Sequence, residues 1–484
     1  MILVGALVGV LVSCLPGLGP TMTVALLIPF TFGMSPTSAL LLLSGVYVGA
    51  MFGGAIPAIL LSTPGTPAAV CTTFDGYPMA QRGQAGKAIS IACIASVVAG
   101  LFGTVVLMTI APPLADFALR FSAPEYFAVA LFGLAVISSL AEGSVLKAFA
   151  SGCIGLLLAV VGMDPMMGAD RFTFGSTELL GGVSFLAVMI GTAAMAEVFY
   201  QIDTYNRHEK LVLLEITDMS LTKEECKRMI KPTIIGCIFG VFIGIMPAAG
   251  ANIASFVSYA QAKLWSKHPE EFGKGSIEGL TASEAGNNSV VGGDLVPMLT
   301  LGIPGDPCTA VMMGALILQG LRPGPLLFQE HPDIMYGLFL GLFISNLWVL
   351  PIGLLGAKFF AKMTFVPKHI LWPVILGLCM TGSFASEGTM APAITVALFG
   401  CIGYFMKKGG YPVAPLILGV LLGPIAEENL RRSLLVSKMD ISIFFTRPIT
   451  LVLLIIAAIT LVMPWVQEWY QTRLAQKAGV DKCD

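Results

Sequence analysis

Apolar residues gather into long runs, separated by polar stretches or by breaks rich in proline and glycine. Most runs are about 20 residues long, the length with which a helix crosses the hydrocarbon core of a bilayer. A bilayer offers the backbone no hydrogen-bond partner, so such runs must form helices. The pattern predicts about 11–13 membrane segments, with clear runs at residues 37–61, 88–111, 124–141, 145–162, 181–200, 231–246, 250–265, 333–357, 369–384, 389–406, 411–425 and 448–466.

Two further apolar pieces, at residues 21–33 and 304–320, are short and bounded by proline and glycine. Neither is long enough to cross the hydrocarbon core. We therefore expect half-helices or re-entrant hairpins at these places. The fold class that follows is an all-α polytopic membrane protein with interrupted helices.

The chain contains an internal repeat. Segment 5–23 aligns without gaps with segment 236–254, and segment 53–67 aligns with segment 293–307. The matched positions are mainly glycines and prolines, which break or unwind helices. Matches in the same order in both halves indicate a duplication. We expect two homologous repeats, inverted relative to each other.

The duplication divides the chain into three parts. Residues 1–200 form a first transmembrane repeat, residues 201–230 a polar connecting loop, and residues 231–484 a second transmembrane repeat with an extra C-terminal span and tail. The connecting loop concentrates lysine and arginine beside spans, and the positive-inside rule then places it in the cytoplasm. The alternative is a basic loop without an orienting role.

The composition excludes several other classes of protein. Hydrophobic residues make up 56% of the chain and charged residues 12%, against roughly 25% charged residues in a soluble domain. These values exclude disorder, a coiled coil and an ordinary soluble enzyme. The formal net charge of −2 gives no support to nucleic-acid binding. The four histidines are scattered and most of the ten cysteines lie inside apolar runs, so we expect no cofactor.

The duplicated breaks are the best candidates for a binding site. In repeat-built transporters, substrate and ion sites lie where paired helices are interrupted. Freed backbone amides can face an anion there, and freed carbonyls a cation. An isolated glycine is better interpreted as a packing notch. The predicted substrate and ion site comprises Gly19, Thr21, Ser62, Thr63, Gly65, Thr66, Gly250, Asn252, Asn287, Asn288, Gly305, Asp306 and Thr309.

Ionisable residues and backbone carbonyls near the breaks are candidates for cation binding. The backbones of Pro16–Gly19 and Pro247–Gly250 are candidates for Na⁺. Asp294 and Asp306 are costly in a spanning segment, by at least ~2.5–3.5 kcal/mol each. One interpretation makes them cation ligands or proton carriers. The other makes Asp306 an N-cap for a helix that begins at Pro307 and places Asp294 near a water-filled mouth.

Several motifs resemble those of the large membrane subunit of the tripartite tricarboxylate transporters, the TctA family. They are PGLGP (16–20), the IPAILLSTPGTPAAV region within 53–88, EAGNNSVVGGDLVPMLTLGIPGDP (284–307) and GYPVAPLILGVLLGP (410–424). The resemblance runs from residue 1 to about residue 470. It implies a multi-pass protein of the bacterial inner membrane that translocates a carboxylate coupled to Na⁺ or H⁺. It also implies two partners, a small four-span membrane subunit and a periplasmic solute-binding protein.

The chain departs from the family pattern at three positions. The family often has asparagine where this chain has Ser62, a small hydroxyl at Asp306 and alanine at Asp294. A negative charge added to a site meant for an anion is unfavourable unless it is protonated or paired with a cation. The departures put citrate in doubt as the substrate. Family members usually begin some tens of residues earlier, so we expect an incomplete N-terminus.

The leading hypothesis is secondary active uptake of a small dicarboxylate or tricarboxylate as the translocating subunit of a tripartite transporter, not an enzyme. The alternative is an intramembrane hydrolase that uses Asp294 and Asp306, and a third possibility is a channel or a scaffolding subunit. The sequence leaves open which carboxylate is carried, which ion is coupled and in what stoichiometry, and the oligomeric state.

Overall fold

The structure, a computed structural model, describes residues 1–15, 17–135, 144–164, 166–204, 216, 218–246, 250–364, 366–387 and 389–477. It is built almost wholly of helices, which confirms the all-α polytopic prediction. Among the described residues, six helices are long and apolar enough to cross a membrane, and seven apolar helices are shorter. The six are Pro36–Leu61, Pro67–Ala118, Phe185–Asp203, Lys223–Ile245, Pro332–Met363 and Met390–Lys408.

The chain divides into two compact units. Unit 1 comprises Met1–Leu119 and Met189–Ile402, and unit 2 comprises Arg120–Val188 and Gly403–Asp484. Both units draw on residues from each half of the sequence. The repeat boundaries predicted at 1–200 and 231–484 are a different kind of division and stay a prediction.

Unit 1 holds most of the helices. They are α1 (Ile2–Ser13), α2 (Pro20–Leu27), η1 (Ile28–Thr31), α3 (Pro36–Gly53), α4 (Ala55–Leu61), η2 (Pro67–Ala69), α5 (Val70–Met79), η3 (Ala80–Gln84), α6 (Ala85–Ala118), η6 (Ile190–Met195), α10 (Ala196–Asp203), α11 (Lys223–Ile245), α12 (Gly250–Trp265), η7 (Pro269–Glu271), α13 (Ile277–Leu301), α14 (Pro307–Leu318), α15 (Leu326–Glu330), α16 (Pro332–Met363), α17 (Lys368–Glu387) and the first part of α18 (Met390–Lys408).

Unit 2 holds fewer elements. They are α7 (Ala123–Ala135), α8 (Val145–Ala159), β1 (Gly162–Met163), β2 (Asp170–Arg171), η5 (Glu178–Gly181), α9 (Phe185–Met189), α19 (Ala414–Val436), α20 (Ile443–Thr446) and α21 (Pro448–Lys477). The two short strands pair antiparallel, with Gly162 opposite Arg171. Helix α19 packs against both α7 and α8.

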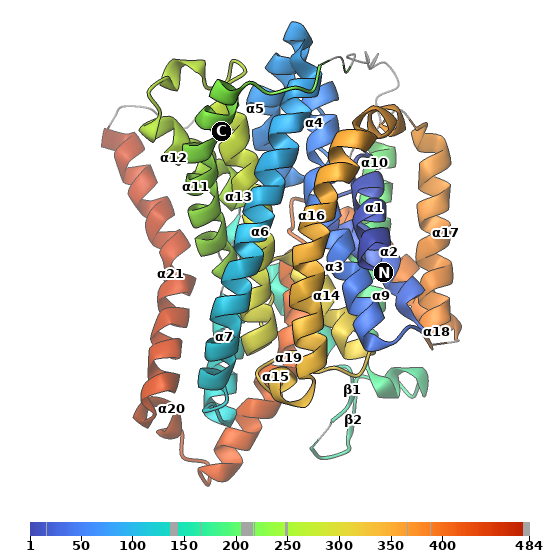
Figure 1. The fold of residues 1–484 in the computed structure, drawn as a ribbon. Helices are drawn as coiled ribbons and strands as arrows, with labels where there is room; N and C mark the ends of the chain where they lie inside the picture. The colour runs from blue at the N-terminus through green and yellow to red at the C-terminus, as the bar shows by residue number, and fades with distance from the viewer. Residues whose placement is uncertain are drawn as a thin grey trace. The chain divides into compact units, whose positions relative to one another are not determined.

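Helix α13 is the most enclosed element of unit 1, and the hydropathy pattern did not predict it as a span. Every residue from Gly279 to Thr300 is buried. The helix packs against α6 and α11, which lie beside it in Figure 1. Its polar residues lower its hydropathy although neighbouring helices cover it on all sides. Helix α11 also begins earlier than expected, at Lys223, inside the segment predicted as a loop.

Glycines let paired helices approach closely in equivalent ways in the two halves. A Cβ added at Gly9 on α1 would lie 2.3 Å from the carbonyl oxygen of Val46 on α3. A Cβ added at Gly240, its repeat partner on α11, would lie 2.6 Å from the carbonyl oxygen of Gly286 on α13. Since neither place has room for a side chain, backbone approaches backbone, as in many membrane helix pairs. The pair α11 and α13 therefore repeats the packing of α1 and α3.

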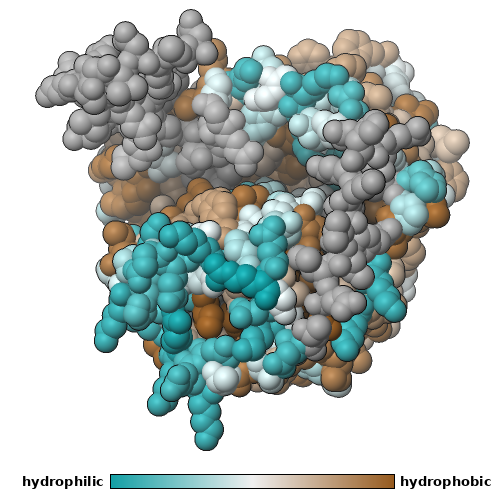
Figure 2. Space-filling view, turned by 90° about the horizontal axis from the view of Figure 1, so that it is seen from above, coloured by the Kyte–Doolittle hydropathy of each residue, from teal (hydrophilic) through white to brown (hydrophobic). Residues whose placement is uncertain are grey.

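Charged residues gather where α6 and α11 begin. Lys87 pairs with Glu225 at 3.0 Å, and Arg228 bonds both Glu271 and Glu278. Viewed from above, the structure shows hydrophilic side chains gathered over one part of the surface, beside apolar ones (Figure 2). Lys87, Glu225 and Glu278 lie in the first turns of α6, α11 and α13, so these ion pairs join the N-terminal ends of helices of unit 1.

Candidate functional site

Both Pro-Gly-x-Pro motifs interrupt their helices in the same way. Helix α4 ends at Ser62, with φ 53° and ψ 21°, and helix α13 ends at Gly302, with φ 69° and ψ 28°. In the first half the Thr63 amide donates to the Pro57 carbonyl at 3.4 Å, and in the second the Ile303 amide donates to Pro297 at 3.3 Å. A left-handed residue followed by this bond is a common helix ending. The predicted interruptions are thus present and equivalent.

A new helix begins after each interruption, and a side chain caps it. The Thr66 hydroxyl accepts from the Ala69 amide at 3.1 Å. At the equivalent position, Asp306 Oδ1 accepts from the Thr309 amide at 2.6 Å and from the Thr309 hydroxyl at 2.8 Å. Asp306 is therefore the N-cap of α14, as one of the two interpretations of the sequence proposed.

The other pair of breaks separates α1 from α2 and α11 from α12. Helix α1 ends at Ser13 and α2 begins at Pro20, whereas α11 ends at Ile245 and α12 begins at Gly250. Pro16 and residues 247–249 lie outside the described residues. The backbone Na⁺ sites predicted there stay predictions.

Interrupted elements from the two halves meet inside unit 1. Helix α2 packs against α14, and α12 packs against η2. Within the second half, Gly250 at the start of α12 lies beside Asp306, because a Cβ added there would come 3.3 Å from the Asp306 Cβ. The Cys71 thiol at the start of α5 contacts the Ser255 carbonyl oxygen of α12 at 3.7 Å. The helix that follows the first break of each half thus packs against the helix that follows the Pro-Gly-x-Pro turn of the other half.

The predicted site residues differ in exposure. Those buried in unit 1 are Gly65, Thr66, Gly250, Asn287, Asn288, Gly305, Asp306 and Thr309. Gly19, Thr21, Thr63 and Asn252 are partly exposed, and Ser62 is exposed. Gly19 stands apart from the packed breaks, since a Cβ added there would meet nothing within 4 Å. The residues that the sequence predicts as one site are therefore not all buried together in the structure.

Two aspartates and a tyrosine form a buried cluster that includes a residue missed by the sequence analysis. The Tyr47 hydroxyl on α3 lies 3.1 Å from Asp294 Oδ2 and 3.1 Å from Asp306 Oδ2. Tyr47 and Asp294 are 0% exposed and Asp306 is 9% exposed. Asp294 lies in α13, not at an exposed mouth. A single tyrosine in an apolar run gives no signal of this contact.

A second buried polar cluster surrounds Glu284. The Thr72 hydroxyl donates to Glu284 Oε1, and the Ser96 hydroxyl donates to Oε2 at 3.1 Å. Asn288 Nδ2 donates to the Ser96 hydroxyl at 2.8 Å and to the Glu284 carbonyl at 3.0 Å. Asn287 points elsewhere, and its Nδ2 donates to the Met51 carbonyl at 3.2 Å. Three segments, α5, α6 and α13, thus hold one carboxyl group among neutral donors.

Comparison with known proteins identifies the family. The model of the tripartite tricarboxylate transporter TctA family matches residues 1–418. The chain belongs to the tripartite tricarboxylate transporter TctA family. It is 41% identical to an uncharacterized 52.8 kDa protein in the TAR-I ttuC' 3' region of Agrobacterium vitis, over 93% of this chain and 90% of that protein. It is 37% identical to an uncharacterized protein in the TAR-II ttuC' 3' region of the same organism, over 44% of this chain and 89% of that protein. No solved structure matches.

Membership of the TctA family fixes the coarse function. The chain is a multi-pass membrane protein and a subunit of a tripartite tricarboxylate transporter, which has further subunits. Among the described residues, no group of three or more His, Cys, Asp or Glu side chains could hold a metal ion. The polar clusters of unit 1 are the candidate site of this transporter subunit.

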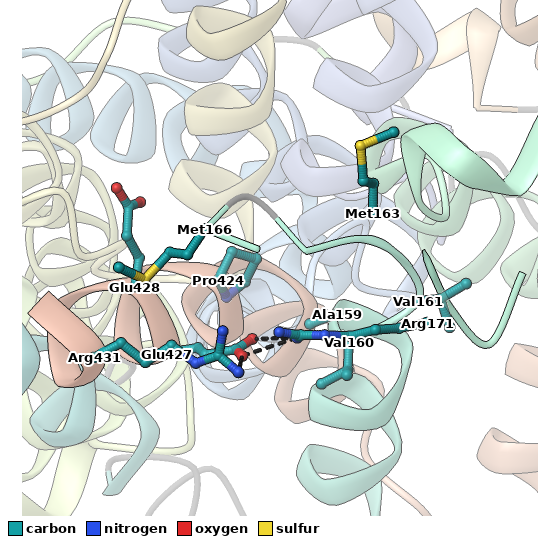
Figure 3. A pocket seen from close by; sticks show the side chains of 10 residues that line it. All are labelled: Ala159, Val160, Val161, Met163, Met166, Arg171, Pro424, Glu427, Glu428 and Arg431. Carbon is teal, nitrogen blue, oxygen red and sulfur yellow. Dashed lines mark hydrogen bonds and ion pairs between the residues drawn. The ribbon is translucent and has the colours of Figure 1, made fainter. Parts of the chain in front are cut away.

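Unit 2 of this TctA-family chain has a charged cavity that the sequence analysis did not single out. The cavity holds about 80 Å³ and lies between the β1–β2 turn and α19 (Figure 3). Arg171 donates to Glu427 at 2.8 Å, and Arg431 donates to Asp164 at 2.8 Å. The hydrogen bond from Arg431 and the Met166 amide hold the pKa of Asp164 well below its usual range. These ion pairs join the β1–β2 segment to α19, and each of the two arginines that line the cavity has a carboxylate partner, so neither is left unpaired for an anion.

Proposed function

We propose that the chain carries out secondary active uptake of a small dicarboxylate or tricarboxylate, coupled to Na⁺ or H⁺. It acts as the translocating subunit in a bacterial inner membrane. A small four-span subunit and a periplasmic solute-binding protein complete the system, as the family implies. The observation that supports this most is the meeting of interrupted helices from both halves inside unit 1.

The two interruptions differ in charge, which suggests different ligands. Asp306 occupies the positive end of α14, so that helix end is already neutralised by a carboxylate. The equivalent cap in the first half is the neutral Thr66. A substrate carboxylate is therefore better accommodated at residues 62–66, where the hydroxyls of Ser62 and Thr66 are available as donors. The coupling cation is better accommodated beside Asp294 and Asp306.

Alternating access then follows from the way the turns and broken helices are paired. The helix that follows each turn packs against a broken helix of the other half, α14 against α2 and η2 against α12. A shift of one half relative to the other would open the turns to one side of the membrane or to the other, as in other repeat-built transporters. Asn288 and the carboxyl of Glu284 lie on α13, the helix that carries the second turn, and the Ser96 hydroxyl reaches both of them from α6.

The proposal is tested by Asn288→Ala with a matched control, Asn346→Ala. Both asparagines are 3% exposed. Each donates to the carbonyl four residues earlier, Asn288 at 3.0 Å and Asn346 at 2.9 Å, and to one hydroxyl. The two substitutions therefore remove the same kinds of hydrogen bond, but only Asn288 lies beside Glu284.

Uptake is measured in cells that express the chain with its partner subunits, using radiolabelled citrate, malate and succinate. We expect Asn288→Ala to abolish uptake at normal membrane levels and Asn346→Ala to retain it. If uptake persists in Asn288→Ala, residues 284–289 do not belong to the substrate and ion site. An equal loss of uptake in both variants would show that uptake needs any such buried hydrogen bond, and that the position of Asn288 beside Glu284 has no special role.

A further inference from the structure

The hydrogen bonds around Tyr47 require a proton that no other group supplies. A phenol has one hydrogen, so it can donate to only one acceptor. Its oxygen nevertheless lies 3.1 Å from one oxygen of Asp294 and 3.1 Å from one oxygen of Asp306. If both contacts are hydrogen bonds, one carboxyl group must be protonated and must donate to the tyrosine oxygen.

The surroundings of the two carboxyl groups differ, and this difference indicates which of the two carries the proton. Asp306 Oδ1 accepts two hydrogen bonds from Thr309 and lies at the N-terminus of α14, whose amides favour a negative charge. Asp294 Oδ1 has no hydrogen-bond partner in the structure and is pressed against Gly305, where an added Cβ would lie 2.8 Å away. Asp306 is therefore the charged carboxylate, and Asp294 is the protonated acid.

Charges nearby do not offer another way to neutralise Asp294. The titratable groups that face it are Tyr47, Asp306 and the buried thiol of Cys308. Within the described part of the chain, no lysine, arginine or histidine makes an ion pair with Asp294 or Asp306. Two adjacent carboxylates without a cation in a buried place carry a large desolvation cost.

We propose that Tyr47, Asp294 and Asp306 form a proton-binding site, and that the proton on Asp294 is the ion coupled to transport. The coupling part rests on the proposed function, whereas the location of the proton does not. Asp294 as a carboxylate takes one proton from water when the site faces one side. It returns that proton to water when the site faces the other side. Tyr47 keeps its hydrogen bond to Asp306 meanwhile.

The repeat limits this site to one copy per chain. The positions equivalent to Asp294 and Asp306 in the first half are Gly54 and Thr66, and Asn287 is the equivalent of Tyr47. None of the three titrates. The first half therefore keeps a neutral turn for the anion while the second half holds the proton, so this site contributes one proton per transport cycle.

The location of the proton is tested by infrared spectroscopy of the full transporter in lipid at neutral pH. A protonated carboxyl group has a carbonyl stretching band that shifts in heavy water. We expect Asp294→Asn to remove one component of this band and Asp306→Asn to retain it. Tyr47→Phe should shift this component without removing it. If Asp294→Asn does not fold, a component that shifts in Tyr47→Phe and is retained in both Asp306→Asn and Glu284→Gln still assigns the proton to Asp294. Glu284→Gln identifies any component that belongs to Glu284.

Two infrared results would overturn the proton site. One is a spectrum of Asp294→Asn identical to that of the parent chain. The other is loss of the component in Asp306→Asn but not in Asp294→Asn, which would put the proton on the wrong carboxyl group.

Coupling is tested in proteoliposomes with the membrane potential clamped, using radiolabelled citrate, malate and succinate. One proton moved per molecule lets a pH difference of one unit sustain about tenfold accumulation. We expect this accumulation in the parent chain and its loss in Asp294→Asn, with counterflow exchange lowered far less. Ser44→Ala is the control, since Ser44 lies one turn from Tyr47 and its buried hydroxyl has no partner in the structure. It should accumulate substrate as the parent chain does.

The outcomes separate the two proposals. Accumulation driven by a sodium gradient alone, or undiminished in Asp294→Asn under a pH gradient, overturns coupling through Asp294. Absence of any flux in the parent chain refutes the proposed function for these acids, and the infrared result then decides the proton site by itself.

Discussion

From the turns that follow α4 and α13, we expect Ser62→Gly and Gly302→Ser to have opposite effects on the stability of the fold. Ser62 and Gly302 hold equivalent places with left-handed backbone, but only one of them is a glycine. The left-handed conformation costs a residue with a side chain about 1–2 kcal/mol. Glycine avoids this cost but loses roughly 0.5–1 kcal/mol more backbone entropy on folding. Ser62→Gly should therefore stabilise the fold by about 0.5–1 kcal/mol.

The reverse change, Gly302→Ser, should cost more than Ser62→Gly gains. It adds the same backbone strain and also brings a Cβ to 3.1 Å from the Pro323 carbonyl oxygen. A tight contact of this kind typically adds about 1–3 kcal/mol when the surroundings cannot move. Ser62 is exposed, so its replacement removes little packing and leaves the backbone as the main cause.

The assay is the melting temperature of the detergent-solubilised chain, followed by its elution as a single species. We expect Ser62→Gly to melt above the parent chain by roughly 1–2 °C and Gly302→Ser to melt below it. Thr63→Gly is the matched control, because Thr63 is adjacent but does not have a positive φ. It should melt lower than the parent chain. If Ser62→Gly also lowered the melting temperature, the left-handed turn would not be the feature that ends α4.

Two other predictions concern packing and pH. Gly292→Ala should destabilise unit 1 strongly, because its Cβ would lie 2.0 Å from the Gly103 carbonyl oxygen. The control Gly377→Ala adds a Cβ that meets nothing within 4 Å, so it should stabilise its helix by about 0.5–1 kcal/mol. Equal melting temperatures for the two variants would contradict this packing. The pKa of Asp164 is lower in the folded chain than in the unfolded chain, so its ionised form stabilises the fold. This stabilisation is fully present above the pKa of an unfolded aspartate, about 3.9. It is lost as the pH falls through the lower pKa of the folded state. Asp164→Asn should therefore flatten the acid branch of a plot of melting temperature against pH, and an unchanged branch would assign it to other groups.

Much of the fold could be predicted from the sequence because the bilayer restricts it to helices. Apolar runs marked most helices, and the paired prolines and glycines marked the interruptions after Leu61 and Leu301. These signals are local, since a left-handed turn needs a permissive residue and a helix N-terminus tolerates proline. The family resemblance, carried by the same motifs, is confirmed over residues 1–418.

Helix α13 shows where hydropathy fails. It carries Glu284, Asn287 and Asp294 and is nevertheless buried along almost its whole length. Its polar groups face helices of the same unit, not lipid, so they contact hydroxyls and other carboxyl groups instead of water. A window of mean hydropathy cannot distinguish such a helix from a loop.

Tyr47 shows where local reasoning about the site fails. It lies 247 residues from Asp294 in the sequence, inside a run that otherwise reads as apolar core. Its role depends on α3 crossing α13 beside the start of α14, which is a property of the tertiary fold. The grouping of residues 120–188 with the C-terminal segment into unit 2 is equally invisible in a one-dimensional pattern.

The central claim is that interrupted helices from both halves form one carboxylate site. It is tested most directly by the rate of maleimide labelling of Ser62→Cys and, separately, Asn252→Cys in the assembled transporter. Cys226 is exposed and serves as the internal control, with the exposed Cys153 and Cys401 replaced. A transported carboxylate should slow labelling at both engineered positions, one in each half, and leave Cys226 unchanged. Protection at only one position, or at neither while uptake continues, would contradict a site shared by the two halves.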